Sequence, residues 1–162
     1  MISIRTKIAA GSMSLLAAAA AVTVPALLGS AGAATAPNEF TVHALHGADT
    51  TIDAGRKGFS AGDDDLSTMH LMRAGKSVGW GVTDCLTVHV GQAHAQQLCT
   101  FALHFGRGQI VATGAVSSGP QGPGTFSIAI TGGTGHYRNA QGQLLVTATS
   151  GRSVPITVEL TG

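Results

Sequence analysis

Three titratable side chains lie on apolar, strand-like segments of the sequence and are the first candidates for chemistry. They are His70, Asp84 and His104. A histidine titrates close to neutral pH, so it can take a proton from a substrate and return it, and a nearby carboxylate can orient it. If these side chains face a cavity, we expect proton transfer or ligand orientation. If they face outward, we expect surface or subunit contacts.

A glycine-rich run, ITGGTGHYRNAQGQL (residues 130–144), raises the question of a phosphate-binding loop. A dinucleotide fingerprint needs a third glycine and leads from a strand into a helix, whose N-terminus holds the pyrophosphate. Here Gly135 is followed by His136, Tyr137 and Arg138. The next segment, GQLLVTATS, is rich in β-branched residues and predicts a strand. We therefore interpret the run as a structured hairpin connection.

Two other patterns only resemble functional motifs. GFSAG (residues 58–62) matches the nucleophile elbow. That motif requires a strand-to-helix turn to expose its serine, whereas an acidic loop and a further strand follow Ser60. The acidic run Asp63–Asp65 lacks the alternating spacing of a calcium loop, so we expect a solvated turn.

A metal site is not expected, although the chain has seven histidines. His43 and His46 would point to opposite faces of one strand. His89 and His94 would likewise point to opposite faces of the hairpin predicted around residues 91–93. No pair has convincing ligand spacing.

The N-terminus predicts export. Arg5 and Lys7 precede a long apolar run that ends in small residues, the pattern of a secretory signal cut after Ala33. We expect residues 1–33 to be a signal peptide and residues 34–162 to form one secreted, extracellular domain with no membrane span. The alternative is an uncleaved membrane anchor. Losing Arg5 and Lys7 moves the formal charge from +1 to −1, and such a near-neutral domain is a poor nucleic-acid binder.

Cys85 and Cys99 are the only cysteines. In an oxidising compartment a disulfide is the first expectation, with two free buried thiols as the alternative. Pairing Val90 with His94 across the turn at residues 91–93 places Cys85 directly opposite Cys99, close enough to bridge.

Short β-type runs separated by glycine-rich turns recur along the rest of the chain, and no segment keeps a helical period for three turns. The predicted strands are Glu39–His46, Asp65–Arg73, Ser77–Val90, Gln97–Phe105, Gln109–Ser117, Thr125–Thr131, Gln143–Thr149 and Val154–Leu160. Eight antiparallel strands with short sequential connections predict an all-β fold, an eight-stranded antiparallel up-and-down β-barrel without exposed edges. A two-sheet sandwich is the alternative.

The central hairpin is apolar on both faces. One face carries Thr83, Cys85, Cys99, Phe101, Leu103 and Phe105. The other carries Trp80, Val82, Leu86, Val88, Leu98 and Ala102, together with Asp84 and His104. A wall that is apolar on both sides suggests that other subunits cover its outside, so we expect a homo-oligomer. Which face lines the lumen stays open.

These features resemble the allene oxide cyclase and dirigent-protein barrel superfamily, in particular its small secreted bacterial members. The most specific part is TGGTGHYRNAQG, which is similar to that family's GGTG followed by an aromatic, a small residue and glycine. CTFALHFGRGQIVATGAV and AGKSVGWGVTDC fit the preceding hairpins, and the resemblance covers roughly residues 40–160. It implies a trimeric barrel with an apolar cavity that receives a reactive small molecule without a cofactor.

The resemblance also bears on site residues. His136, Tyr137 and Arg138 become candidate ligand contacts; the alternative is that Tyr137 packs across the barrel end and Arg138 lies at the surface. Many dirigent-like members carry paired aspartates on the second strand, where this chain has Met69, His70 and Leu71. His70 would then take over proton transfer, or the chemistry has been lost.

The leading hypothesis is a secreted barrel that binds a small apolar molecule in its lumen and steers its cyclisation or isomerisation. The candidate ligands are lipid-like, phenolic or polyketide molecules. The alternatives are a non-catalytic carrier or scavenger of a hydrophobic metabolite and a purely structural protein of the cell surface.

Overall fold

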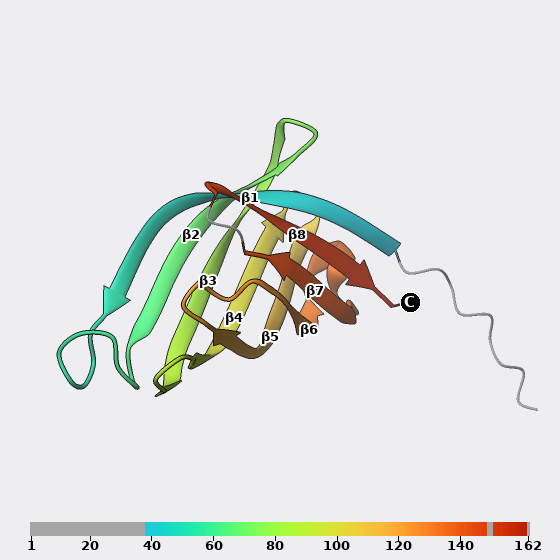
Figure 1. Cartoon of the computed structure of the whole chain (residues 1–162). Coiled ribbons are helices and arrows are strands. Elements are labelled where there is room, and N and C mark those ends of the chain that lie inside the picture. Colours follow the sequence, from blue (N-terminus) through green and yellow to red (C-terminus); the bar gives the residue numbers. More distant parts are fainter. Residues whose placement is uncertain (1–37, 149–150, 162) are drawn as a thin grey trace, which may run out of the picture. The chain divides into compact units, whose positions relative to one another are not determined.

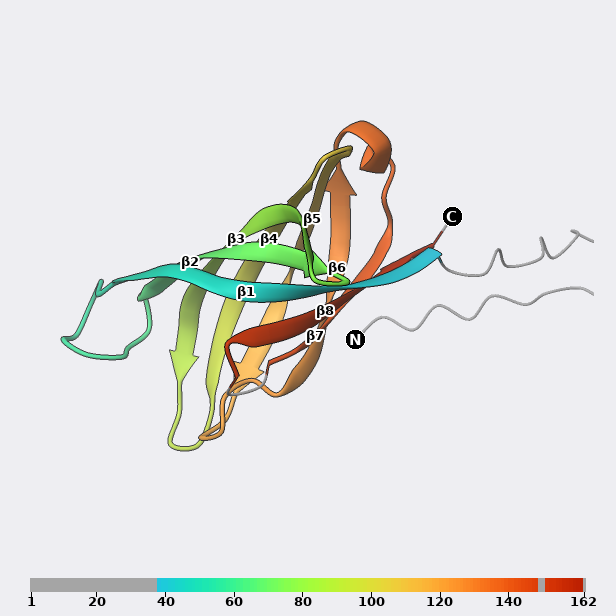
Figure 2. The same cartoon turned by 90° about the horizontal axis from the view of Figure 1, so that it is seen from above.

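Eight strands close into one antiparallel barrel in the computed structural model, which describes residues 38–148 and 151–161 (Figures 1 and 2). They are β1 (Asn38–Ile52), β2 (Asp64–Arg73), β3 (Lys76–Val90), β4 (Ala95–Phe105), β5 (Gly108–Ser118), β6 (Thr125–Gly133), β7 (Gly142–Thr147) and β8 (Ser153–Leu160). Each strand pairs with the next, and β8 pairs with β1. The predicted up-and-down barrel is confirmed and the sandwich is excluded.

The N-terminal segment expected to be a signal peptide, residues 1–33, lies outside the described residues and stays a prediction. Within the described part of the chain, no helix has the length and apolar character needed to cross a membrane.

Side chains alternate between the lumen and the outside of the barrel, as the two-residue period of a strand requires. On β4, Cys99, Phe101 and Leu103 are buried inside, whereas Leu98 and His104, which flank this stretch and point the other way, are exposed. The middle of the barrel is filled by fully buried aliphatic side chains. These are Val42, Leu71, Leu103, Ile110, Leu144, Ile156 and Val158. The face of the central hairpin that carries the cysteines is therefore the lumen side.

One end of the barrel is closed by the glycine-rich run. After β6, a short 3₁₀ helix, η1 (Gly135–Tyr137), brings Tyr137 onto Phe105, with 5.6 Å between the ring centroids. Gly135 has a φ of +59°, and a Cβ there would lie 2.5 Å from the carbonyl oxygen of Arg107. This glycine serves a tight turn and a close backbone approach. The run is followed by strand β7, as the hairpin interpretation predicted.

Cys85 and Cys99 lie directly opposite each other on β3 and β4 and form a disulfide, as predicted. The register nearer the turn differs from the prediction, because Val90 pairs with Ala95 and not with His94. A bulge at Val88 adds one residue to β3 and absorbs the difference.

The acidic run is not a solvated turn throughout. Asp63 is buried, and its carboxylate accepts hydrogen bonds from the backbone N–H groups of Ala54 (3.1 Å) and Ser60 (2.6 Å). A loop turning back on itself leaves such N–H groups without strand partners, and a buried carboxylate satisfies them. Asp64 and Asp65 begin β2. Strand β1 is also longer than predicted, ending at Ile52 rather than His46.

Candidate functional site

A cavity of about 490 Å³ occupies the end of the barrel opposite η1. Its apolar lining comes from inward-facing positions of all eight strands: Ala44, Met69, Cys85, Cys99, Phe101, Val116, Phe126, Val146, Val154 and Ile156. Leu71 and Leu103, the next inward positions of β2 and β4, are fully buried and form its floor. Such a concave, mainly apolar space suits a small organic molecule.

Polar groups gather at the mouth of this cavity. Those in its lining are His46, Ser67, Thr68, Thr83, Gln97 and Arg152. A second hollow of about 300 Å³ shares Ser67, Thr83 and Gln97 and adds Asp49, Thr51 and Asp65, so the mouth continues into a polar groove on the inner face of β1 to β4.

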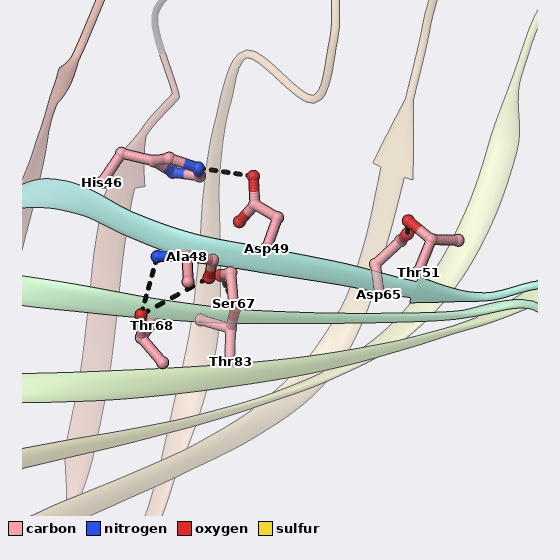
Figure 3. A network of polar contacts seen from close by, with 8 residues as sticks. All are labelled: His46, Ala48, Asp49, Thr51, Asp65, Ser67, Thr68 and Thr83. Atoms are coloured by element: carbon pink, nitrogen blue, oxygen red, sulfur yellow. Dashed lines mark hydrogen bonds and ion pairs between the residues drawn. The ribbon is translucent and has the colours of Figure 1, made fainter.

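Hydrogen bonds tie the polar groove together across the strands. The hydroxyls of Ser67 and Thr83 are bonded to each other (Figure 3). The carboxylate of Asp65 accepts hydrogen bonds from Thr51 Oγ1 (2.7 Å) and Gln97 Nε2 (3.2 Å). Side chains held in this way present fixed donors and acceptors to a ligand.

His46 and Asp49 form an ion pair or hydrogen bond at the mouth, with 2.5 Å between His46 Nε2 and Asp49 Oδ2 (Figure 3). Their side chains are 57% and 56% exposed, so both can be reached from solvent and from the cavity. A β-bulge brings them together: His46 pairs with Met69 and Asp49 with Ser67, leaving Gly47 and Ala48 opposite one residue of β2.

The structure places His70, Asp84 and His104 on the outside of the barrel, where all three are exposed. Because Met69 and Leu71 point inward on β2, His70 between them points outward, and the same alternation turns Asp84 and His104 away from the lumen. His104 stacks on Trp80, with 5.1 Å between the ring centroids. The structure therefore places these three residues at the outer surface, and not in the lumen where proton transfer to a ligand was expected.

His136, Tyr137 and Arg138 lie at the closed end, away from the 490 Å³ cavity. His136 and Tyr137 border a hollow of about 280 Å³ beside Phe40 and Phe105. Tyr137 is half-buried against Phe105, and Arg138 is exposed. This placement matches the alternative in which Tyr137 packs across the barrel end.

Sequence reasoning missed the polar residues of the mouth. The two-residue period would have placed Ser67 with Met69 and Gln97 with Cys99, once the lumen face was known. No sequence signal marked His46 and Asp49, because a regular strand would point them to opposite faces. In the described part of the chain, no three metal-ligating side chains lie close enough to hold a metal ion.

The closed barrel with a cavity at one end has the fold of the allene oxide cyclase and dirigent-like barrel superfamily, and the resemblance inferred from the sequence is confirmed. Among solved structures, a pyocyanin demethylase is 28% identical with a TM-score of 0.69, over 76% of this chain and 99% of its own. An exo-specific intermolecular Diels-Alderase is 12% identical (TM-score 0.61; 79% and 100% covered).

A pterocarpan synthase dirigent protein is 13% identical to the chain, with a TM-score of 0.53 over 78% of this chain and 84% of its own. The similarity to the dirigent protein and the Diels-Alderase lies in the fold. No protein-family model and no curated protein sequence matches the chain.

Proposed function

We propose that this protein is a secreted barrel that binds a small, mainly apolar molecule in the 490 Å³ cavity and steers its cyclisation or isomerisation. The observation that carries the proposal is the arrangement of the cavity lining. Its floor and walls are apolar, and its polar side chains gather at one mouth. The fold shared with Diels-Alderases and a dirigent protein supports the same use of the lumen.

The cavity would act by restricting the ligand. Aromatic and branched walls such as Phe101, Phe126 and Ile156 leave a flexible apolar molecule few conformations, so reacting atoms are held near each other. The hydroxyls of Ser67 and Thr83 and the amide of Gln97 would bind a polar group at the mouth and fix the orientation.

The candidate ligands are lipid-like, phenolic and polyketide molecules, whose apolar bodies match the lining. The similarity to a pyocyanin demethylase adds pyocyanin itself to the compounds to be tested.

A non-catalytic carrier or scavenger is the second candidate function. It is favoured by the outward placement of His70, Asp84 and His104, which removes from the lumen the acid–base groups expected from the sequence. A carrier would release its ligand chemically unchanged after incubation, whereas a cyclase or isomerase would release a rearranged product of equal mass.

The outer wall suggests a homo-oligomer, and by the family resemblance we propose a trimer. Large apolar side chains are exposed on the outer face of β3 and β4: Trp80, Val82, Leu86, Val88 and Leu98. Contiguous apolar surface of this kind is typical of subunit contacts. Light scattering should give three times the mass of one mature chain, and Leu98→Lys should lower the measured mass. A wild-type monomer would refute the trimer.

Export is tested by sequencing the N-terminus of protein from the culture medium, which should begin at Ala34.

The binding proposal is tested with a matched pair of substitutions on β5. Val116 lines the cavity, and its neighbour Ala115 is exposed on the outer face. Val116→Trp should fill the cavity and weaken binding of the neutral fluorescent probe N-phenyl-1-naphthylamine by at least about tenfold, whereas Ala115→Trp should not. Ala44→Leu is a second, smaller filling variant, and the melting temperature of each variant shows whether it is folded.

Native mass spectrometry followed by denaturation should identify a co-purified ligand. Equal probe binding by the two folded β5 variants would contradict a lumen site.

A further inference from the structure

His46 is the one histidine that lines the 490 Å³ cavity, and all seven histidines of the chain lie in the described part. It stands on β1 two residues after Ala44, which is buried in the same wall. Its ring therefore borders apolar space on one side and solvent on the other. A molecule with an apolar body in the cavity would bring its outer end to this ring.

The contact with Asp49 fixes which ring nitrogen of His46 is free. An ionised carboxylate only accepts hydrogen bonds, so Nε2 of His46 carries the proton and donates it to Asp49 Oδ2. The other nitrogen, Nδ1, then holds a lone pair and is the basic site. A carboxylate that holds an imidazole in one tautomer and stabilises its protonated form is the arrangement used by general bases.

Besides Asp49, two charged residues lie near His46 at the cavity mouth: Arg152 and Asp65. Arg152, on the β7–β8 connection, lines the same cavity, and its backbone carbonyl accepts a hydrogen bond from the backbone N–H of His46 (3.3 Å). The nearby carboxylate of Asp65 is engaged by Thr51 and Gln97. Among the described residues, Arg152 is the one permanently charged cation in the cavity lining.

We propose that His46 is a general base at the cavity mouth, that Asp49 is its positioning residue, and that Arg152 stabilises the anion formed. This inference rests on the proposed function and deepens it, because it names the substrate class: apolar molecules with an acidic C–H next to a carbonyl group. Nδ1 of His46 takes the proton from that carbon, and the C–H electron pair moves into the conjugated system as an enolate. Nδ1 then returns the proton to a different carbon. The net change is an isomerisation, without oxidant or reductant.

The experiment uses 5-nitrobenzisoxazole, a small aromatic probe of bases in apolar sites. A base removes its ring C–H proton, the C–H pair forms a nitrile, and the N–O bond breaks to give a coloured phenolate. The wild-type protein should accelerate this reaction over buffer. His46→Gln should lower kcat/KM by at least about 100-fold, whereas His43→Gln, on the outer face of β1, should leave it unchanged.

Asp49 is tested by the split between kcat and KM. Asp49→Asn should lower kcat by at least about tenfold with KM little changed, since the amide no longer favours the productive tautomer. Asp49→Glu should restore part of kcat, a rescue not expected from a merely structural role. Arg152→Gln should lower kcat as well, because the developing phenolate loses its cation.

Failure of this inference is distinguishable from failure of the proposed function. If wild type binds N-phenyl-1-naphthylamine in the cavity but does not accelerate the probe reaction, or if His46→Gln is as active as wild type, the general base is refuted and ligand binding stands. If the dye does not bind and Val116→Trp has no effect on the probe reaction, the cavity site itself is refuted.

Discussion

Asp64 and Asp84 lie close to each other on the outer faces of β2 and β3, where Asp84 acts on the pKa of Asp64. Oδ1 of Asp64 is shielded from water, and no N–H or O–H group of the described residues donates to it. Loss of hydration raises the pKa of Asp64, and the neighbouring carboxyl groups of Asp84 and Asp65 raise it further.

This pair predicts that the protein loses stability as its carboxyl groups ionise. The pKa of Asp64 is higher in the folded state than the ordinary 3.8, so folding binds a proton and is favoured at low pH. That contribution falls as the pH rises from about 3.8 through the raised pKa. Asp64→Asn should therefore raise the free energy of unfolding at neutral pH and flatten its pH dependence, measured by urea denaturation across pH. An unchanged pH dependence in Asp64→Asn would contradict the assignment, and Asp84→Asn should act in the same direction.

The bulge that unites His46 and Asp49 depends on Gly47. A Cβ there would lie 2.5 Å from Thr68 Oγ1 and 2.9 Å from its carbonyl oxygen, and Thr68 Oγ1 accepts the N–H of Ala48 (2.9 Å). We expect Gly47→Ala to destabilise the fold by about 1–2 kcal/mol and to release His46 from Asp49. The ring ¹⁵N shifts of His46 should change from one tautomer to a mixture. Gly106→Ala is the control, because a Cβ there meets nothing within 4 Å.

The disulfide Cys85–Cys99 joins residues 14 apart and should stabilise the barrel by about 3 kcal/mol, mainly by restricting the unfolded chain. Urea denaturation of wild type with and without reductant, beside the Cys85→Ala/Cys99→Ala double variant, measures this. Because both sulfurs also line the cavity, the double variant should alter binding of the fluorescent probe. Equal stability of reduced and oxidised protein would show that the bridge contributes nothing.

Tyr137 is expected to stabilise the closed end without contacting a ligand in the cavity. Tyr137→Ala removes its packing on Phe105 and should cost about 2 kcal/mol, with probe affinity unchanged. Arg138→Ala, next to it and exposed, should change stability by less than about 0.5 kcal/mol. Loss of cavity binding in a folded Tyr137→Ala protein would restore the ligand role first considered for this residue.

Much of the fold follows from local sequence patterns. The β-rich runs and their glycine turns predicted all eight strands. The disulfide was also predicted, although the pairing next to the turn differs by one residue and the bulge at Val88 restores the register at Cys85 and Cys99. These predictions hold because strand propensity, turn chemistry and the two-residue period act over a few residues. The same period correctly separated the two faces of the central hairpin.

The sequence by itself therefore determined the strands, their order and the two sets of side chains. Only the tertiary structure decided which set lines the lumen, because both faces are apolar and a period of two does not distinguish inside from outside until the sheet closes. Because the cysteine-bearing face lines the lumen, His70, Asp84 and His104 lie on the outer surface. The mouth was likewise decided by long-range contacts: Thr68 on β2 holds the bulge in β1, and that bulge turns His46 and Asp49, three positions apart, onto one face.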